Sequence, residues 1–370
     1  MQKSRTLPAI AAVCCASLAV ALSGVATSSA SPYAGKAQHH ASKLKAHPYI
    51  GFANETDEGT FQRDVAAGIA AQAKKFGDKL VSLTNAATDA TALKNASVIA
   101  DDHVTVAIEF QEDAKIGPEI ATMFKKAGIK YTIAIDIPQP GAIFFGSSNW
   151  TNGFNTGIHL GLYAKSHKFN SKDTYVLEEA ITTAGATVAL RMQGELHGIL
   201  KYFPGIPHKQ IILQNAGGTT SKAETLVAEV LPRIPTNDHI IVTNINTQTG
   251  LGALRALQVA GRAKLAIIGA QGLTPIGIAA IKAKNSHWIG DTAYFPEDYG
   301  SEVFKLIADF VAGRKVAPYV YIPAVWITKK SIDKYYPGKD LRSVKTPGAL
   351  VFSKTIPHVK TGVGTRLAYS

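Results

Sequence analysis

The sequence predicts an α/β protein with two doubly wound parallel-sheet lobes. Short β-branched runs alternate with amphipathic helical patterns along most of the chain, as in parallel strands joined by helical crossovers. The alternation stops at residues 137–141, where two prolines and a glycine occur together, and then starts again. At 370 residues, the chain also exceeds the length of one ordinary domain.

The first series of elements covers residues 47–145. Strands are expected at residues 47–53, 79–83, 104–110, 131–137 and 142–145. Helices are expected at residues 61–76, 92–100 and 119–127. In the first of these helices, Val65, Ile69 and Ala73 recur at the spacing of a single buried face.

The second series follows the same rule. Strands are expected at residues 174–178, 210–214, 239–246, 265–269 and 288–295, and a final strand at 320–328. Helices are expected at residues 153–166, 188–202, 223–231, 248–260 and 298–312, with one more before residue 288. Gly261 is placed to end the helix before it.

Polar residues end two neighbouring strands of the unit at residues 239–272. Asn246 follows the first strand, and Gln271 follows the second. The carboxyl ends of parallel strands meet at one edge of a sheet, where open α/β folds bind ligands. Both side chains are therefore candidate ligand contacts.

The N-terminus has the pattern of a cleavable export signal at residues 1–30. Lys3 and Arg5 precede an apolar stretch at residues 10–22, and small residues end the segment. The alternative is an uncleaved membrane anchor over residues 7–25. Both cysteines lie in this segment, so the mature chain would form no disulfide. Residues 31–46 are expected to be a flexible leader.

The chain is basic, with a formal net charge of +12. Residues 1–30 contain two basic and no acidic residues, so their removal would leave +10. Residues 329–370 hold nine Lys or Arg against two Asp. Aromatic residues are not interleaved there as in a nucleic-acid stacking platform. A solvated basic tail at residues 333–370, or one touching anionic envelope material, is expected instead of nucleic-acid binding.

Residues 250–261 (GLGALRALQVAG) and 267–272 (IIGAQG) resemble the ribose and sugar-binding branch of the periplasmic binding proteins, the solute receptors of bacterial ABC importers. Asn246, Gly252, Gly261, Gly269 and Gly272 match the family pattern. Thr247 replaces an Asp, and Ala270 with Gln271 replaces an aromatic-Asp pair. The resemblance implies a retained fold and a different solute.

The resemblance also implies how the chain is divided. In periplasmic binding proteins of type I, three crossing segments form a hinge, expected here near Ser147, Phe295 and Ala324. The N-terminal lobe would comprise residues 47–147 and 296–323. The C-terminal lobe would comprise residues 148–295 and 324–332.

The family's solute contacts map onto candidate residues of this sequence. An aromatic ring can stack on a sugar face, carboxylates accept hydroxyl hydrogen bonds, and Arg or amide groups donate them. Asn149 is expected to cap a helix. Core packing for Phe61 and a surface ion pair for Arg191 remain open. The main candidates are Phe61, Glu109, Asp136, Arg191, Asn246 and Gln271, and the weaker ones are Gln62, Ser148 and Tyr294.

The sequence thus indicates an exported, periplasmic receptor that captures a sugar or polyol and delivers it to the membrane permease of an ABC importer. No catalytic set, metal site or cofactor motif is found, and a monomer is expected. An acidic sugar remains open because Arg191 and the basic chain would favour one. A receptor for a chemotaxis or sensor-kinase system, and a secreted carbohydrate-active enzyme using Glu109 with Asp136, are the alternatives.

Overall fold

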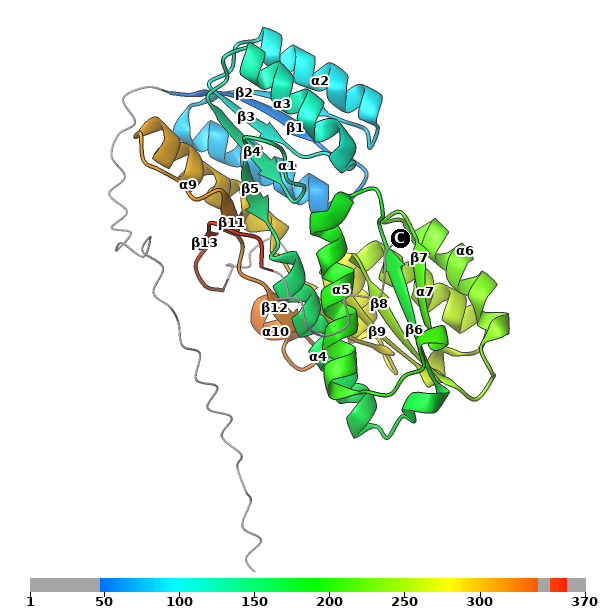
Figure 1. Ribbon diagram of the computed structural model, residues 1–370. Helices are drawn as coiled ribbons and strands as arrows, with labels where there is room; N and C mark the ends of the chain where they lie inside the picture. Colours follow the sequence, from blue (N-terminus) through cyan, green and yellow to red (C-terminus); the bar gives the residue numbers. More distant parts are fainter. Residues whose placement is uncertain (1–46, 339–346, 358–370) are drawn as a thin grey trace, which may run out of the picture. The chain divides into compact units, whose positions relative to one another are not determined.

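The computed structural model describes residues 47–338 and 347–357. The expected export signal and leader lie outside the described residues, as do residues 339–346 and 358–370 of the expected tail. Within the described ranges, no helix combines the length and the apolar character needed to cross a bilayer. Two sheets, each covered by helices on both faces, organise this part of the chain (Figure 1).

The first sheet has the strand order β13-β11-β5-β4-β3-β1-β2. Its neighbours pair in parallel, except that β13 runs antiparallel to β11. The strands are β1 (Tyr49–Asn54), β2 (Lys79–Thr84), β3 (Val106–Glu109), β4 (Tyr131–Ile135), β5 (Ile143–Gly146), β11 (Tyr319–Tyr321) and β13 (Val351–Ser353). Helices α1 (Thr60–Phe76) and α9 (Tyr299–Val311) cover one face, and α2 (Asp89–Asp101) and α3 (Gly117–Lys126) cover the other.

The second sheet has the order β12-β10-β9-β8-β6-β7, with only β12 antiparallel to its neighbour. Its strands are β6 (Thr174–Ala180), β7 (Ile211–Asn215), β8 (His239–Asn244), β9 (Ala266–Gly272), β10 (Trp288–Ala293) and β12 (Val325–Ile327). Helices α4 (Asn149–Ser166) and α5 (Gly185–Tyr202) cover one face. Helices α6 (Thr220–Val230), α7 (Thr247–Val259) and α8 (Pro275–Lys282) cover the other, and the short α10 (Ile332–Tyr335) packs beside them.

Burial on both faces explains why the strands are continuous apolar runs instead of alternating ones. In β8, every residue after His239 is buried. The helices bury one side only, as in α1, where Val65, Ile69 and Ala73 face the sheet. Gly261 follows α7 with φ +68°, the left-handed conformation predicted for the end of that helix. The predicted two-lobed alternation is therefore confirmed.

Glycines on both helices, including Gly161, bring α4 and α5 into backbone contact. A β-carbon at Gly153 or Gly157 would collide with the carbonyl oxygens of Arg191 and Glu195. One at Gly194 or Gly198 would collide with the backbone of α4. Because glycine has no β-carbon, the two helices approach more closely than ordinary side chains would allow. This approach places the N-terminal turn of α4 beside Arg191.

The prediction of one strand over residues 320–328 is wrong. The structure has β11 in the first sheet and β12 in the second, separated by Ile322, Pro323 and Ala324. Proline has no backbone N–H, so it cannot continue a strand ladder. The chain thus passes between the sheets here, as it does after β5 and after β10. The lobe limits given above remain a prediction.

The expected solvated tail is partly wrong as well. Residues 351–353 form β13 at the edge of the first sheet. Tyr336 is buried in the second lobe, where its ring stacks on Phe295 at 6.0 Å between centroids. Since β13 belongs to the first sheet, the chain passes between the two sheets a fourth time, which the sequence did not predict.

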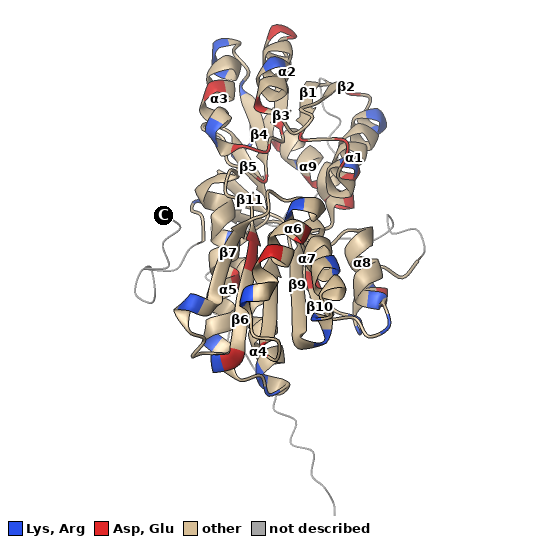
Figure 2. Ribbon diagram, turned by 90° about the vertical axis from the view of Figure 1, so that its right-hand side faces the viewer, with Lys and Arg blue, Asp and Glu red and all other residues tan. Residues whose placement is uncertain are grey.

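Charge is distributed unevenly over these elements. In the described strands, Lys79 is the one Lys or Arg residue, and the other basic positions lie on helices and loops (Figure 2). Buried carboxylic acids, by contrast, occur within the strands, at Glu109, Glu178, Glu179 and Asp291. The excess of basic residues therefore lies on the helices and loops, and not in the strands.

Candidate functional site

A pocket lies at the carboxyl ends of the strands of both sheets. From the first lobe it is lined by Glu55, Phe61, Gln62, Phe110, Gln111, Glu112, Asp136 and Ile137. From the second lobe it is lined by Ile181, Ala184, Val188, Arg191, Ile245, Asn246, Thr247, Gln248, Gln271, Gly272, Thr274 and Tyr294. Its volume is about 110 Å³. A water-sized group needs about 10–15 Å³ of such volume, so the pocket accommodates a small molecule with on the order of ten non-hydrogen atoms.

Asp136 lines the pocket immediately after β4. Its backbone has φ +57°, a left-handed conformation that aspartate tolerates better than most residues. One carboxylate oxygen, Oδ1, accepts a hydrogen bond from the Ser147 amide at 3.1 Å. Burial raises the pKa of Asp136 to about 6, although Arg191 and the Ser147 amide lower it. Its other oxygen can accept a hydrogen bond from a solute.

Arg191 faces this carboxylate from the second lobe. Its Nε donates to Asn149 Oδ1 at 2.9 Å, and Nη1 donates to the Ile245 carbonyl at 2.7 Å. Asn149 therefore orients Arg191, and the prediction that it caps α4 is wrong. The guanidinium also lies over the Tyr294 ring, 5.3 Å from its centroid. Arginine has five N–H groups, so others remain for a solute.

A chain of hydrogen bonds holds Gln271. The Tyr294 hydroxyl donates to Gln271 Oε1, and Gln271 Nε2 donates to Glu195 Oε1. Burial raises the pKa of Glu195 to about 8, although the hydrogen bonds from Gln271 and Thr243 lower it. Gln271, which replaces a residue of the family pattern, thus contacts Glu195 of α5. Their pairing fixes the orientation of the amide behind Tyr294.

Asn246 lines the pocket and also caps α7. Its Oδ1 accepts from the Thr249 amide at 2.9 Å, and its Nδ2 donates to the Gly218 carbonyl at 3.0 Å. Both amide groups are thus already used within the second lobe. The side chain is therefore a structural element of the pocket wall, whether or not it also contacts solute.

We expect Asn246→Ala to lower the free energy of unfolding of the solute-free protein by about 0.5–2 kcal/mol, the usual cost of losing a capping side chain. Asn246→Ser should recover most of this loss, because serine retains an acceptor for the Thr249 amide. Urea unfolding midpoints of the three proteins provide the measurement. Equal midpoints for the parent and the alanine variant would contradict the capping role.

Phe61 combines the two roles that the sequence left open. It lines the pocket, and its ring packs edge-on against Tyr299 at 5.4 Å between centroids. Beside it, Gln62 Nε2 donates to Glu55 Oε2 at 3.0 Å. Gln62 therefore lines the pocket and forms a hydrogen bond with Glu55, which also lines it.

Two candidates do not line the pocket. Glu109 accepts from Asn85 Nδ2 at 3.0 Å, and burial raises its pKa to about 8, with no contribution from Asp136. Side chains alternate along a strand, and Glu109 points to the α2 and α3 face together with Ala107. Ser148 contacts Thr151 through its hydroxyl. Seven of the nine candidates are brought together, and their ligand roles remain a proposal.

Six polar residues of the pocket were missed from the sequence, and three of them, Thr247, Gln248 and Thr274, belong to the second lobe. Glu55 follows β1, and Gln111 and Glu112 follow β3. The sequence contains a signal for these residues, because polar residues directly follow both strands. The acidic residue expected to contact solute after the third strand was Glu109, whereas the one that lines the pocket is Glu112. Within the described part of the chain, no group of three His, Cys, Asp or Glu side chains is arranged to hold a metal ion.

The periplasmic binding protein domain is the family whose model matches residues 50–315 of this chain. Three solved structures are similar in fold. An ABC transporter periplasmic solute-binding protein from Actinobacillus succinogenes with bound D-allose has 18% identity and a TM-score of 0.65, and the match covers 78% of this chain and 100% of that one. A protein from Mycobacterium smegmatis in complex with β-D-fucofuranose has 18% identity and a TM-score of 0.68, with 79% and 95% covered. An ABC transporter solute-binding protein from Agrobacterium vitis with bound allitol has 17% identity and a TM-score of 0.67, with 78% and 97% covered.

A comparison with curated protein sequences finds no match.

Proposed function

Because this chain belongs to the periplasmic binding protein family, we propose that it is an exported receptor that captures a sugar or polyol and delivers it to the permease of an ABC importer. The observation that carries the proposal is the pocket at the carboxyl ends of both sheets, where aromatic and hydrogen-bonding groups converge. Three similar folds hold D-allose, β-D-fucofuranose and allitol, which supports a small hydroxylated solute.

The two lobes contact each other beside the pocket. The Ala114 amide donates to the Thr183 carbonyl at 3.3 Å. Ile137 from the first lobe packs in one buried apolar cluster with Val188, Met192 and Ile245 from the second. A solute touching both lobes adds contacts that exist only when the lobes are close. Binding therefore shifts the population toward closure, and the permease is proposed to recognise the closed form.

Binding and release without chemical change are proposed, with a monomer acting in the periplasm after removal of the export signal. Expression of the full chain in a bacterial host should yield the protein in the periplasmic fraction. Deletion of its gene should abolish uptake of the bound solute.

Loss of a chemotactic response with uptake intact would favour the sensory alternative. Conversion of a bound glycoside by the purified protein would favour the enzyme.

Melting temperatures measured with and without hexoses, pentoses and polyols test the binding step. A solute at about 100 times its dissociation constant should add about 2.7 kcal/mol to the free energy of unfolding. Asp136→Asn should abolish this effect, because it removes the charge while the asparagine Oδ1 can still accept from the Ser147 amide. Asp173→Asn, an exposed control at the opposite end of the second sheet, should retain it. Equal shifts in both variants would show that solute does not bind at Asp136.

A further inference from the structure

The polar groups of the pocket are divided unevenly between the lobes. Three carboxyl groups, those of Glu55, Glu112 and Asp136, line it from the first lobe after β1, β3 and β4. Arg191 is the one Lys or Arg among the lining residues. Asp136 and Arg191 form no ion pair within 4.0 Å, although the charge of Arg191 lowers the pKa of Asp136. Carboxyl groups therefore outnumber the cationic donor in the pocket.

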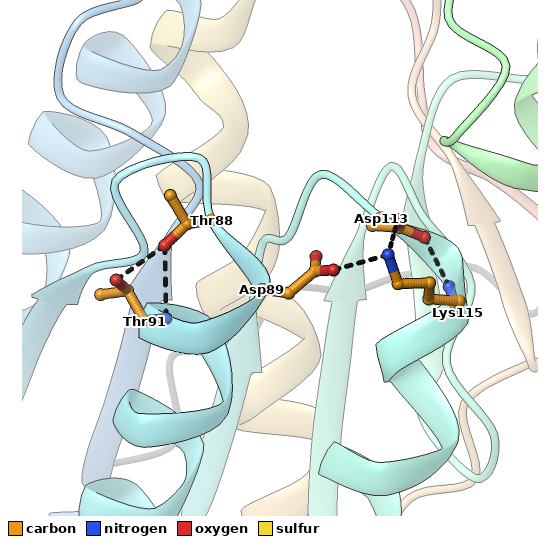
Figure 3. Close-up of polar contacts among 5 residues, drawn as sticks. All are labelled: Thr88, Asp89, Thr91, Asp113 and Lys115. Carbon is orange, nitrogen blue, oxygen red and sulfur yellow. Dashed lines mark hydrogen bonds and ion pairs between the residues drawn. The ribbon is translucent and has the colours of Figure 1, made fainter.

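Lys115, three residues after Glu112 in the chain, does not neutralise these carboxyl groups. Lys115 Nζ lies 2.7 Å from Asp89 Oδ2 and 2.9 Å from Asp113 Oδ2, as Figure 3 shows. Glu112 is not among its partners, and within the described ranges Glu112 forms no ion pair of its own. Burial raises the pKa of Glu112, and repulsion by Asp113 and Asp89 raises it further. Its half-buried carboxyl thus lines the pocket without a counter-charge.

The carboxyl groups also repel one another. Burial raises the pKa of Glu55 to about 8, although the hydrogen bond from Gln62 lowers it. Charge repulsion by Glu112 and Asp136 contributes to the raised pKa. The ionised forms of Glu112 and Asp136 thus disfavour ionisation of Glu55. A cation between them would relieve the repulsion and favour their ionised forms.

Apart from Arg191, the polar groups that the second lobe offers to the pocket are neutral. The amides of Asn246 and Gln271 each use one of their two N–H groups in the hydrogen bonds described above. Gln111, which is 2% exposed, lines the pocket on the acidic side, and neither of its amide atoms has a partner. Because a buried amide without partners is costly, a polar ligand group beside Gln111 is indicated.

Resting on the function proposed above, we propose that the solute carries an ammonium group beside its hydroxyls, as an aminohexose does. An ammonium group has three donors and no acceptor, which complements Glu55, Glu112 and Asp136. The hydroxyl groups would then lie toward Arg191 and Tyr294. An aminohexose has a size that suits a pocket of about 110 Å³. The basic net charge of the chain thus does not predict an acidic solute.

Calorimetric titration of protein purified after expression of the full chain tests the proposal. The probes are the 2-amino and 6-amino deoxyhexoses of glucose, galactose and mannose, together with each parent hexose and each N-acetyl derivative. Glucuronate serves as the anionic probe. At least one aminohexose should bind more than tenfold tighter than its parent and its N-acetyl derivative, because acetylation removes the charge at the same position. This preference should weaken at high salt.

Two variants and one control locate the preference. Glu112→Gln and Glu55→Gln should each reduce the ratio of aminohexose to parent-hexose affinity at least fivefold. Glu109→Gln changes a buried acid of the same sheet that does not line the pocket, and this ratio should stay within twofold. Melting temperatures of all three variants establish that they are folded.

The outcomes separate the two proposals. A parent hexose or glucuronate that binds at least as tightly as every aminohexose overturns the ammonium inference and leaves the sugar receptor standing. An amine preference that survives in both pocket variants also overturns it. No binding of any probe, together with no shift from the hexoses, pentoses and polyols above, overturns both.

Discussion

Replacing Arg191 by methionine is expected to weaken solute binding by about 100-fold, or ~2.7 kcal/mol. The guanidinium is 8% exposed and is oriented by Asn149 and the Ile245 carbonyl. It therefore meets a solute without a large cost in side-chain entropy, and its charge-assisted hydrogen bonds are stronger than neutral ones. Titration calorimetry with the tightest-binding sugar or polyol measures the loss.

A matched control separates binding from folding. Arg262 is equally buried, at 9% exposure, and it donates to the carbonyls of Ile234, Pro235 and Asp238 far from the pocket. Arg262→Met should destabilise the protein by an amount similar to Arg191→Met, but should leave solute affinity within twofold. Arg191→Lys should recover only part of the affinity, because lysine keeps the charge without the planar fork. Affinity within threefold of the parent in Arg191→Met would remove Arg191 from the site.

The elements of the fold could be predicted because their patterns are local. The period of the apolar residues identifies a helix such as α1, and a run buried on both faces identifies a strand such as β8. Strand pairing depends on distant residues instead. The local pattern at residues 320–328 does not show that one half pairs with β5 and the other with β10, and only the family resemblance indicates a crossing near Ala324. For the same reason, β13 could not be recognised at the end of a basic segment.

The site was predictable to the extent that it follows strand ends. Asp136, Asn246 and Gln271 each come at or after the end of a parallel strand, and the structure brings them to one pocket. The orientation of a side chain was not predictable in this way. Glu109 points to α2 and α3, whereas Glu112, in the following loop, lines the pocket. Side-chain hydrogen bonds between distant residues could not be predicted either. Asn149 and Arg191, which form such a bond, are 42 residues apart in the sequence.

The buried carboxylic acids predict a pH dependence opposite to that of paired surface carboxylates. Burial raises the pKa of Glu179 to about 8 from an ordinary value of 4.5, and neither of its oxygens has a hydrogen-bond partner. Between these pH values, the folded protein holds the proton that the unfolded chain releases. The free energy of unfolding must then fall as pH rises from about 5 to 8. Glu55, Glu109 and Glu195 contribute in the same direction.

Glu179→Gln is therefore expected to stabilise the protein at pH 8 by at least ~1 kcal/mol and to change its stability little at pH 5. Glutamine carries no charge, and its Nε2 can donate to Asn244 Oδ1, which lacks a partner on the same face of the neighbouring strand. Melting temperatures at both pH values measure the effect. The exposed Glu229→Gln on α6 serves as the control for losing one negative charge. If the melting temperatures of Glu179→Gln and Glu229→Gln fell equally from pH 5 to pH 8, Glu179 could not be the source of this pH dependence.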